Sequence, residues 1–327
     1  MENFSSEQST VDISIVVCTY NRAEMLEDTL RSWVTVDKES IHVELVVVDN
    51  NSTDLTRQVV RQFEQARPGE VIYVFEDKPG LSFARNKGIE IARGRLIAFV
   101  DDDIYFTEDW LKEILNTFRN QGRADCVGGN SIPSFEIPKP EWLTDDLMRV
   151  YGSTLSGETE KVMAFPEHPF GVNMVFKREV FERIGLFNTR LGRIKKSLLS
   201  NEEKELFYRI DQAGLLTYYS PKAIIFHRIP ADRIDQRWIL RRMYWQGISK
   251  VSFSQIIDKK SRFYLLKDTL RNFKNFLFGQ RPYSVRNCIV FFPWQAFKVK
   301  LRAVLSFGIT IQSLIEIFNH RDLKINQ

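Results

Sequence analysis

Cysteine, glycine and proline are scarce in this chain of 327 residues. It has only three cysteines, Cys18, Cys126 and Cys288, which lie far apart in the sequence. An odd number of isolated cysteines builds neither a disulfide framework nor a CxxC metal site, so we expect a reducing compartment. With 16 glycines and 11 prolines the chain is neither collagen-like nor of low complexity, and 25 phenylalanines supply apolar surface for a folded core.

Signals for secretion and for membrane crossing are also missing. The N-terminal residues MENFSSEQST lack the basic and then apolar build of a signal peptide. The longest uncharged apolar runs, residues 287–297 and 303–315, are well short of the roughly 20 residues that span a bilayer. We therefore expect a chain that is not exported and does not cross a membrane.

Positive charge is concentrated in the last third of the chain. The net charge is +4, but residues 237–302 carry 15 Lys or Arg against two acids, a local net of +13. The remaining residues therefore sum to −9, and the basic stretch also holds 14 aromatic side chains. Such a segment favours a polyanionic partner, either a membrane surface or a nucleic acid.

Strand-like apolar runs alternate with helical segments from residue 12 onward. Strands are predicted at residues 12–18, 43–49, 71–75 and 95–100, and helices at 23–34, from Ser52 or Thr53 towards 63, at 81–92, and from Thr107. Alternating strands and helices with short connections predict an α/β domain with a mostly parallel sheet covered by helices.

This alternation stops after residue 129. Residues 131–169 are rich in Pro, Glu and Lys, and a connection of that length inside a compact domain is usually functional or disordered. Further elements are predicted as a strand at 171–176, a helix near Lys177, a helix at 202–213 and a strand at 223–227. Beyond Asp235 the chain is predicted to be helical, basic and aromatic to its end.

Three adjacent acids, Asp101, Asp102 and Asp103, directly follow the apolar run LIAFV. Ligands of parallel sheets bind outside the carboxyl ends of strands, and adjacent carboxylates repel one another unless a cation is bound. Hard oxygen ligands suit Mg²⁺ or Mn²⁺. The alternative is a solvated turn that caps a helix at Thr107.

A fourth acid, Asp49, ends the second predicted strand in VVVDNNSTD. It can accept hydrogen bonds from a nucleobase or a ribose, as acids at strand ends do in dinucleotide folds. An Asx turn or a helix cap is the alternative, because Asn50, Asn51, Ser52 and Asp54 all suit such turns.

Several ordered motifs resemble the family 2 glycosyltransferases with the GT-A fold. The donor half is represented by SIVVCTYNR (14–22), VVVDNNSTD (46–54), GLSFARNKGIEIARG (80–94) and IAFVDDD (97–103). The likeness continues through FGVNMVFKREVFERIGLFNTRLGR (170–193), NEEKELFYRIDQAG (201–214) and HRIPADR (227–233). It implies an α/β, Rossmann-like central sheet flanked by helices over residues 12–235, with a helical basic extension behind it.

The resemblance assigns donor-binding roles by position. Its expected cofactor-binding residues are Thr19, Tyr20, Arg22, Asp49, Arg85, Asp101 and Asp102. The expected ligands of a Mn²⁺ or Mg²⁺ ion are Asp103, Asp101 and His227. The implied donor is a nucleoside-diphosphate sugar, with UDP as the expected nucleotide and the base left open.

The resemblance also implies inverting transfer, which needs one base for the acceptor hydroxyl. The family usually supplies an Asp in an ED pair at a helix start, whereas this chain has Asn201-Glu202-Glu203. Glu203 falls where the Asp would be, and the choice between Glu202 and Glu203 stays open. Two acids in a first helical turn are also favoured simply by the helix dipole.

Other positions are expected around the acceptor. The stretch Gly171-Val172-Asn173 resembles the border of the family's acceptor site. Trp142 either stacks on a sugar or pins the irregular loop to the core.

The C-terminal region carries an apolar stripe at helical spacing, formed by Leu301, Val304, Ile311, Ile315 and Phe318. Such a stripe normally packs on a core or on a partner helix. Together with CIVFFPW and the upstream basic cluster it resembles an interfacial membrane anchor. No nucleic-acid-binding motif is present, so we expect an anionic membrane surface, bound through residues 237–318, and no nucleic acid.

We therefore expect an N-terminal tail (1–11), a glycosyltransferase domain (12–235, divided at 130 into a donor half and an acceptor half) and a membrane-associating region (236–327). The expected enzyme is cytoplasmic, peripheral on the inner face of the cell membrane, and transfers a sugar to a glycan or lipid-linked acceptor in surface polysaccharide synthesis. A nucleotidyltransferase and a non-catalytic sugar-nucleotide-binding membrane scaffold are the alternatives. The Gly-rich phosphate loop of the former is missing, and the retained acids argue against the latter.

Overall fold

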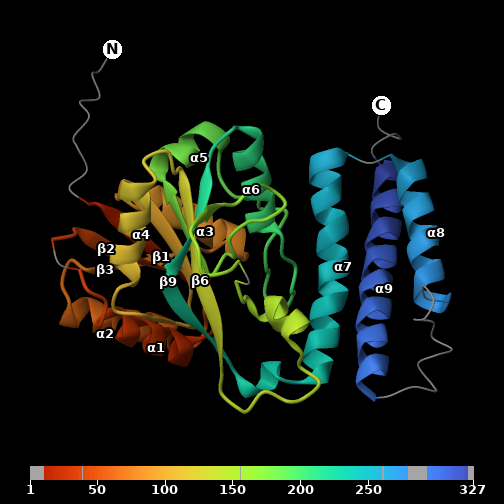
Figure 1. The fold of residues 1–327 in the computed structure, drawn as a ribbon, viewed down its shortest axis with the longest axis horizontal. Helices are drawn as coiled ribbons and strands as arrows, with labels where there is room; N and C mark the ends of the chain where they lie inside the picture. Colours follow the sequence, from red (N-terminus) through yellow and green to blue (C-terminus); the bar gives the residue numbers. More distant parts are fainter. Residues whose placement is uncertain (1–10, 39, 155, 260, 279–292, 323–327) are drawn as a thin grey trace. The chain divides into compact units, whose positions relative to one another are not determined.

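The computed structural model describes residues 11–38, 40–154, 156–259, 261–278 and 293–322 of the chain (Figure 1). Most of the predicted N-terminal tail and Cys288 therefore lie outside the described residues. The chain divides into two compact units. Unit 1 comprises Met1–Ser134, Tyr151–Thr189 and Leu206–Ile229, and unit 2 comprises Phe135–Val150, Arg190–Glu205 and Pro230–Gln327.

Unit 1 is built on one sheet, which has nine strands in the described part of the chain. The strands are β1 (Ile13–Thr19), β2 (Val43–Asp49), β3 (Val71–Phe75), β4 (Leu96–Asp101), β5 (Ile104–Phe106), β6 (Cys126–Phe135), β7 (Lys161–Val162), β8 (Asn173–Lys177) and β9 (Thr217–Ile229). Their order is β3-β2-β1-β4-β8-β6-β9-β5, and β7 pairs with β9. Strands β3, β2, β1 and β4 are parallel, whereas β8 is antiparallel to β4 and β6, and β9 is antiparallel to β5 and β7.

Helices cover both faces of this sheet (Figure 1). One face packs against α1 (Ala23–Trp33), α2 (Thr56–Ala66) and α4 (Trp110–Asn120), and the other against α3 (Leu81–Ile91), α5 (Arg178–Ile184) and the part of α6 (Glu202–Gln212) from Leu206 onward. The side chains of a strand alternate between its faces, so Ile13, Ile15 and Val17 of β1 enter the first core and Val16 the second. Because both faces are covered, the central strands are mainly apolar, and the buried Ser14 and Glu44 of β1 and β2 are hydrogen-bonded to each other.

The predicted α/β fold with helices flanking the sheet is confirmed, and three details differ from the prediction. The predicted helix after β2 begins at Thr56, not at a cap of Ser52 or Thr53. The helix predicted from Thr107 begins at Trp110, behind the short strand β5, which was not predicted. The last strand is longer than the predicted 223–227, because β9 runs from Thr217 to Ile229 and pairs with both β5 and β7.

Unit 2 is mainly helical, as predicted for the C-terminal extension. It contains α7 (Gln236–Asp258), α8 (Arg262–Phe278) and α9 (Pro293–Asp322), and α9 packs against both α7 and α8 (Figure 1). The short 3-10 helix η2 (Ala231–Arg233) precedes α7. A second one, η1 (Asp145–Tyr151), lies in the long connection after β6, where Trp142 packs edge-on against Phe297 with ring centroids 5.3 Å apart. This contact is of the kind expected if Trp142 holds the irregular loop against the folded chain.

Helix α9 is longer and more continuous than the uncharged runs of the sequence indicated. Helix α9 contains a segment of 22 residues, Phe297–Phe318, that is long and apolar enough to cross a membrane by length and composition. The sequence prediction counted only uncharged runs, but a continuous helix joins such runs across isolated charged residues.

Candidate active site

Three of the predicted site residues end neighbouring parallel strands. Thr19 ends β1 and is in register with Asp49 at the end of β2. Asp101 ends β4 and is in register with Cys18, the residue before Thr19. The carboxyl ends of the three strands therefore bring a hydroxyl and two carboxylates to one edge of the sheet, where α/β sheets bind their ligands. Tyr20 follows β1 directly and is half-buried.

The loops after β1 and β2 are held together by side-chain hydrogen bonds. Asn21, with φ of 52°, accepts a hydrogen bond from the Thr53 amide at 2.7 Å through Oδ1, and its own amide donates to Ser52 Oγ at 2.9 Å. The amide of Ala23 donates to Asp54 Oδ2 at 3.0 Å. Ser52 and Thr53 thus fix the neighbouring loop, which explains why neither of them caps α2.

Asp49 is buried and has a defined orientation. Its Oδ1 accepts a hydrogen bond from the Ser52 amide and its Oδ2 accepts one from the Tyr73 hydroxyl, both at 2.8 Å. Burial and this bond to the carboxylate raise the pKa of Tyr73 to about 12, so the phenol keeps its proton and remains a donor at neutral pH. Each carboxylate oxygen retains a lone pair for a further donor.

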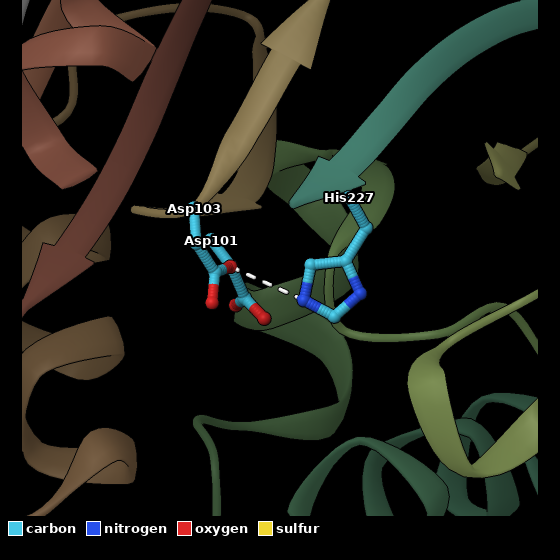
Figure 2. A group of neighbouring side chains, drawn as sticks. All are labelled: Asp101, Asp103 and His227. Atoms are coloured by element: carbon cyan, nitrogen blue, oxygen red, sulfur yellow. Dashed lines mark ion pairs between the residues drawn. The ribbon is translucent and has the colours of Figure 1, made fainter. Parts of the chain in front are cut away.

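Asp101, Asp103 and His227 form one cluster (Figure 2). A carboxylate oxygen from each acid and a ring nitrogen of His227 all lie within 4.8 Å of one another. Antiparallel pairing of β5 with β9 sets His227 opposite Ile104, the residue after Asp103. His227 Nε2 lies 3.2 Å from Asp103 Oδ1, and Nδ1 lies 2.7 Å from the carbonyl oxygen of Tyr151. The carbonyl can only accept, so Nδ1 carries a proton and Nε2 is the nitrogen that faces the acids.

The electrostatics of the cluster follow from these contacts. Burial lowers the pKa of His227, but the charge of Asp103 and the hydrogen bond to it outweigh burial, and the net shift is upward. Arg22 Nη1 contacts Asp102 Oδ1 at 2.5 Å and Asp103 Oδ2 at 2.9 Å. Burial raises the pKa of Asp102, and the charge of Asp103 adds to this while that of Arg22 opposes it. The acids are thus compensated by an arginine and a histidine.

Arg85 is buried although it is charged, with only 3% of its surface exposed. Its Nη2 lies 3.7 Å from Asp101 Oδ1 and 3.5 Å from the carbonyl oxygen of Gly171, and its guanidinium lies 5.3 Å from the centroid of the Phe187 ring. Gly171 leaves the room for it, because a Cβ at that position would lie 2.6 Å from Nη2. The predicted donor contact is therefore fixed beside the acidic cluster.

Asn173, expected near an acceptor, is fully engaged inside unit 1. Its Oδ1 accepts a hydrogen bond from Trp110 Nε1 at 3.1 Å, and its Nδ2 donates to the carbonyl oxygens of Asn130 at 3.2 Å and Ala223 at 3.0 Å. These bonds connect α4, β6, β8 and β9. In the structure the side chain of Asn173 therefore ties the sheet together.

The candidate bases Glu202 and Glu203 belong to unit 2, in the first turn of α6. Glu202 is buried and Glu203 half-buried. The preceding residues are bound to α7: Arg242 Nη1 donates to the carbonyl oxygen of Leu198 at 3.0 Å, and Ser249 Oγ accepts from the Ser200 amide at 3.0 Å. Burial and the charge of Arg193 lower the pKa of Arg242 to about 10, against the opposing charges of the two glutamates.

Sequence reasoning missed several of these contacts. Tyr73 orients Asp49, the carbonyl of Tyr151 orients His227, and Arg242 contacts the chain that leads into α6. Only the contact between Tyr73 and Asp49 could have been found from the sequence pattern. Tyr73 pairs with Val47, two residues before Asp49, and side chains two residues apart in a strand share a face.

Comparisons with known proteins agree with this architecture. The family model described as glycosyl transferase family 2 matches residues 14–185. A glucosyl-dolichyl phosphate glucuronosyltransferase of Haloferax volcanii is 30% identical over 265 residues, which cover 79% of this chain and 83% of that protein. The succinoglycan biosynthesis protein ExoM of Rhizobium meliloti is 27% identical, over 73% of this chain and 74% of that protein.

Two solved structures share the fold. The mannosyltransferase PcManGT of Pyrobaculum calidifontis, solved with GDP-Man and Mn²⁺, superposes with a TM-score of 0.61 at 20% identity, over 94% of this chain and 88% of that one. Residues 1–349 of S. aureus TarS give a TM-score of 0.53 at 15% identity, over 91% of this chain and 90% of that one.

The fold, the strand-end acids and the matching family model together define the class. This chain belongs to glycosyl transferase family 2, and it is a glycosyltransferase of glycan or glycoconjugate synthesis.

Proposed function

We propose that the chain transfers a sugar from a UDP-linked donor to a hydroxyl of a glycan or lipid-linked acceptor, with inversion at the anomeric carbon. The observation that carries the proposal is the cluster of Asp101, Asp103 and His227 at the carboxyl end of β4, beside Arg85. It combines a set of cation ligands with a buried guanidinium, and both a divalent cation and an arginine are suited to binding a diphosphate.

The side chains of Asp101, Asp103 and His227 fit a divalent cation. Two carboxylates and an imidazole nitrogen within 4.8 Å of one another suit Mn²⁺ or Mg²⁺, and the carbonyl of Tyr151 holds the imidazole so that Nε2 faces the acids. When bound, the cation supplies Lewis-acid stabilisation for the charge of a departing nucleoside diphosphate.

Residues of unit 1 bind and orient the donor in this proposal. Asp49 accepts hydrogen bonds from the base, since Tyr73 and the Ser52 amide hold its carboxylate while leaving lone pairs. Thr19 and Tyr20 line the nucleotide site at the end of β1, and Arg22 contacts the carboxylates of Asp102 and Asp103 beside it. Arg85 presents its guanidinium to the diphosphate.

Glu203 takes the proton of the acceptor hydroxyl in this proposal, and Glu202 is the second candidate. Both lie in the first turn of α6, where the helix dipole favours the ionised form that a base needs. Inversion follows if the hydroxyl attacks from the face opposite the leaving nucleotide in a single displacement.

Two further parts of the proposal concern organisation. Residues 12–235 act as the transferase domain and 236–327 as the membrane-associating region, which places the enzyme on the inner face of the cell membrane. The basic and aromatic composition of residues 237–302 supports an anionic membrane as the partner.

The experiment is a thermal-shift screen of UDP, GDP and their sugar conjugates with Mn²⁺, Mg²⁺ or EDTA. A ligand at 100 times its Kd adds about 2.7 kcal/mol of stability, which is visible as a raised melting temperature. We expect a shift with UDP conjugates that EDTA removes. A shift with guanosine conjugates alone overturns the choice of base, and no shift with any nucleotide overturns the donor site and favours the scaffold alternative. NMR of the anomeric proton of the product decides between inversion and retention.

A further inference from the structure

Helix α8 exposes apolar side chains along one of its sides. Phe263, Leu266, Leu270 and Phe273 recur at steps of three, four and three residues, so they lie on one helical face, called the α8 stripe below. Phe263 is 77% exposed and Leu270 61%, and the other two are also exposed. An exposed row of four large apolar side chains is unusual for a protein surface in water.

The buried side of α8 is more polar than the stripe, among the side chains that the structure describes. Leu265, Thr269 and Asn272 are buried there, and Leu265 shares a small core with Val251 of α7 and Ile309 of α9. Thr269 Oγ1 donates to the carbonyl oxygen of Leu265 at 2.7 Å and Asn272 Nδ2 to that of Asp268 at 2.8 Å. A helix that packs in water buries its apolar face, so the distribution in α8 is inverted.

The contact between α7 and α9 also buries small and polar residues. The two backbones approach closely where Gly247 faces Gly308, since a Cβ on Gly247 would lie 2.3 Å from the carbonyl oxygen of Leu305. Ser249, Thr310 and Ser313 are buried as well. Small and hydroxylated residues at helix contacts, with large apolar side chains pointing outward, are typical of helices that pack in lipid.

Basic side chains border the α8 stripe. Lys267 and Arg271, both exposed, directly follow Leu266 and Leu270, and Arg271 also pairs with Asp268. These charges make α8 unsuited to cross the hydrocarbon core, but lysine and arginine next to an apolar face reach anionic headgroups while the apolar face enters the acyl region.

We infer that the α8 stripe inserts into the acyl region of an anionic membrane, with Lys267 and Arg271 at the headgroups. The inference rests on the membrane location in the proposed function and deepens it from adsorption at the surface to insertion. Lipid covers the α8 stripe, because a protein partner on this face would not explain the polar residues on the buried side of the same helix.

The experiment is flotation of the full chain with vesicles of phosphatidylcholine and phosphatidylglycerol. Adsorption by charge alone is lost at about 1 M salt, where the screening length is about 3 Å, whereas an inserted apolar face keeps the protein on the vesicles. We expect the wild type to float at low and at high salt. Leu266→Glu and Leu270→Glu should each weaken binding at least about tenfold, because each brings a carboxylate to the acyl region.

Leu186→Glu is the matched control, since Leu186 in unit 1 and Leu266 are both 48% exposed and the chemical change is the same. Its binding should equal that of the wild type. Because a variant can lose binding by unfolding, the wild type is also cross-linked with a phospholipid that carries a photoreactive group in its acyl chain. Label should be found within residues 263–273.

The outcomes separate insertion of the α8 stripe from the membrane location as a whole. Flotation at low salt that disappears at high salt overturns insertion while the membrane location stands. Equal binding of Leu266→Glu, Leu270→Glu and the wild type, or label found only outside α8, also overturns insertion. Self-association without flotation at any salt overturns the membrane location and makes the stripe a protein contact. Donor binding is measured without vesicles, so failure of the donor site remains distinguishable.

Discussion

Nη1 of Arg22 lies 2.9 Å from Oδ2 of Asp103, so the first loop of the sheet supplies a positive charge to the acid that ends the DDD triplet. The other oxygen of the same carboxylate faces His227 Nε2 at 3.2 Å. Two basic groups therefore face Asp103, the Arg22 guanidinium and the His227 imidazole, and the imidazole can gain or lose a proton. A divalent cation can take the place of that proton while Arg22 stays bound to Asp102.

Asp103→Asn should remove cation-dependent donor binding. Changing a residue that only orients a metal ligand typically costs ten to a hundredfold in affinity, so loss of a ligand should cost at least about a hundredfold. Titration calorimetry of the donor with Mn²⁺ and with EDTA measures the effect. The matched change Asp102→Asn removes a contact to Arg22 but no predicted ligand, so it should preserve Mn²⁺ dependence and lower stability by about 1–3 kcal/mol. Equal Mn²⁺ dependence in Asp103→Asn and the wild type would exclude Asp103 as a ligand.

The stability of the metal-free chain should fall as the pH rises through the titration of His227. Asp103 raises the pKa of His227 in the folded chain above its ordinary value of about 6.5, so the folded state holds this proton more tightly than the unfolded one. The stabilisation is fully present below about pH 6.5 and disappears as the pH passes the raised pKa. Melting temperatures in EDTA across this range measure it.

His227→Gln should flatten this dependence on pH. His42→Gln is the control for the loss of an imidazole, because the ring of His42 is mainly exposed. An unchanged slope in His227→Gln would mean that another group carries the proton.

The strand-end residues could be predicted from sequence because they follow uninterrupted apolar runs. Such a run indicates a buried parallel strand, and the carboxyl ends of these strands meet at one edge. Thr19, Asp49 and Asp101 therefore come together as expected. The roles assigned to them are carried by the resemblance and remain predictions.

Contacts between distant segments could not be predicted in this way. The bond between Arg242 and the carbonyl oxygen of Leu198 depends on how a helix packs, and no local pattern encodes that. The same holds for Asn173, which binds the carbonyl oxygen of Ala223, 50 residues away. Composition gave the basic and aromatic character of the C-terminal region, but the inverted burial in α8 required the structure.

Gly171→Ala should displace Arg85. The new Cβ would lie 2.6 Å from Nη2, so the guanidinium at the end of the flexible arginine side chain should shift and withdraw from Asp101. We expect about tenfold weaker donor binding, with cation dependence retained, and a loss of about 1–3 kcal/mol of stability from overpacking. Titration calorimetry and chemical denaturation measure the two effects.

Gly122→Ala is the matched control for this change, because nothing lies within 4 Å of a Cβ at Gly122. It should leave donor binding and stability unaltered. If Gly171→Ala also binds the donor normally, Arg85 is not a donor contact.

Glu203→Gln should preserve donor binding and reduce turnover. The amide keeps the shape of the side chain but cannot take a proton, and general base catalysis contributes about 10²–10⁴-fold. Nucleotide release during transfer measures turnover, and calorimetry measures donor affinity. Glu202→Gln, one residue away in the same helical turn, should stay close to the wild type in both. The opposite pattern would assign the base role to Glu202.

Arg242 should act as a positioning residue for this acid, since it binds the carbonyl oxygen of Leu198 at 3.0 Å and Ser200 Oγ at 3.3 Å just before α6. Arg242→Met should reduce kcat about tenfold or more and leave donor affinity unchanged, because a small displacement of a catalytic group is costly. The acidic limb of the pH profile should also move to higher pH, since loss of the positive charge favours the protonated acid.

Arg242→Lys should restore part of the rate and most of the profile. Arg241→Met is the control, because Arg241 donates to the carbonyl oxygen of Lys196, which lies further from α6 along the chain. If both methionine variants lower kcat alike without moving the pH profile, the role of Arg242 is structural.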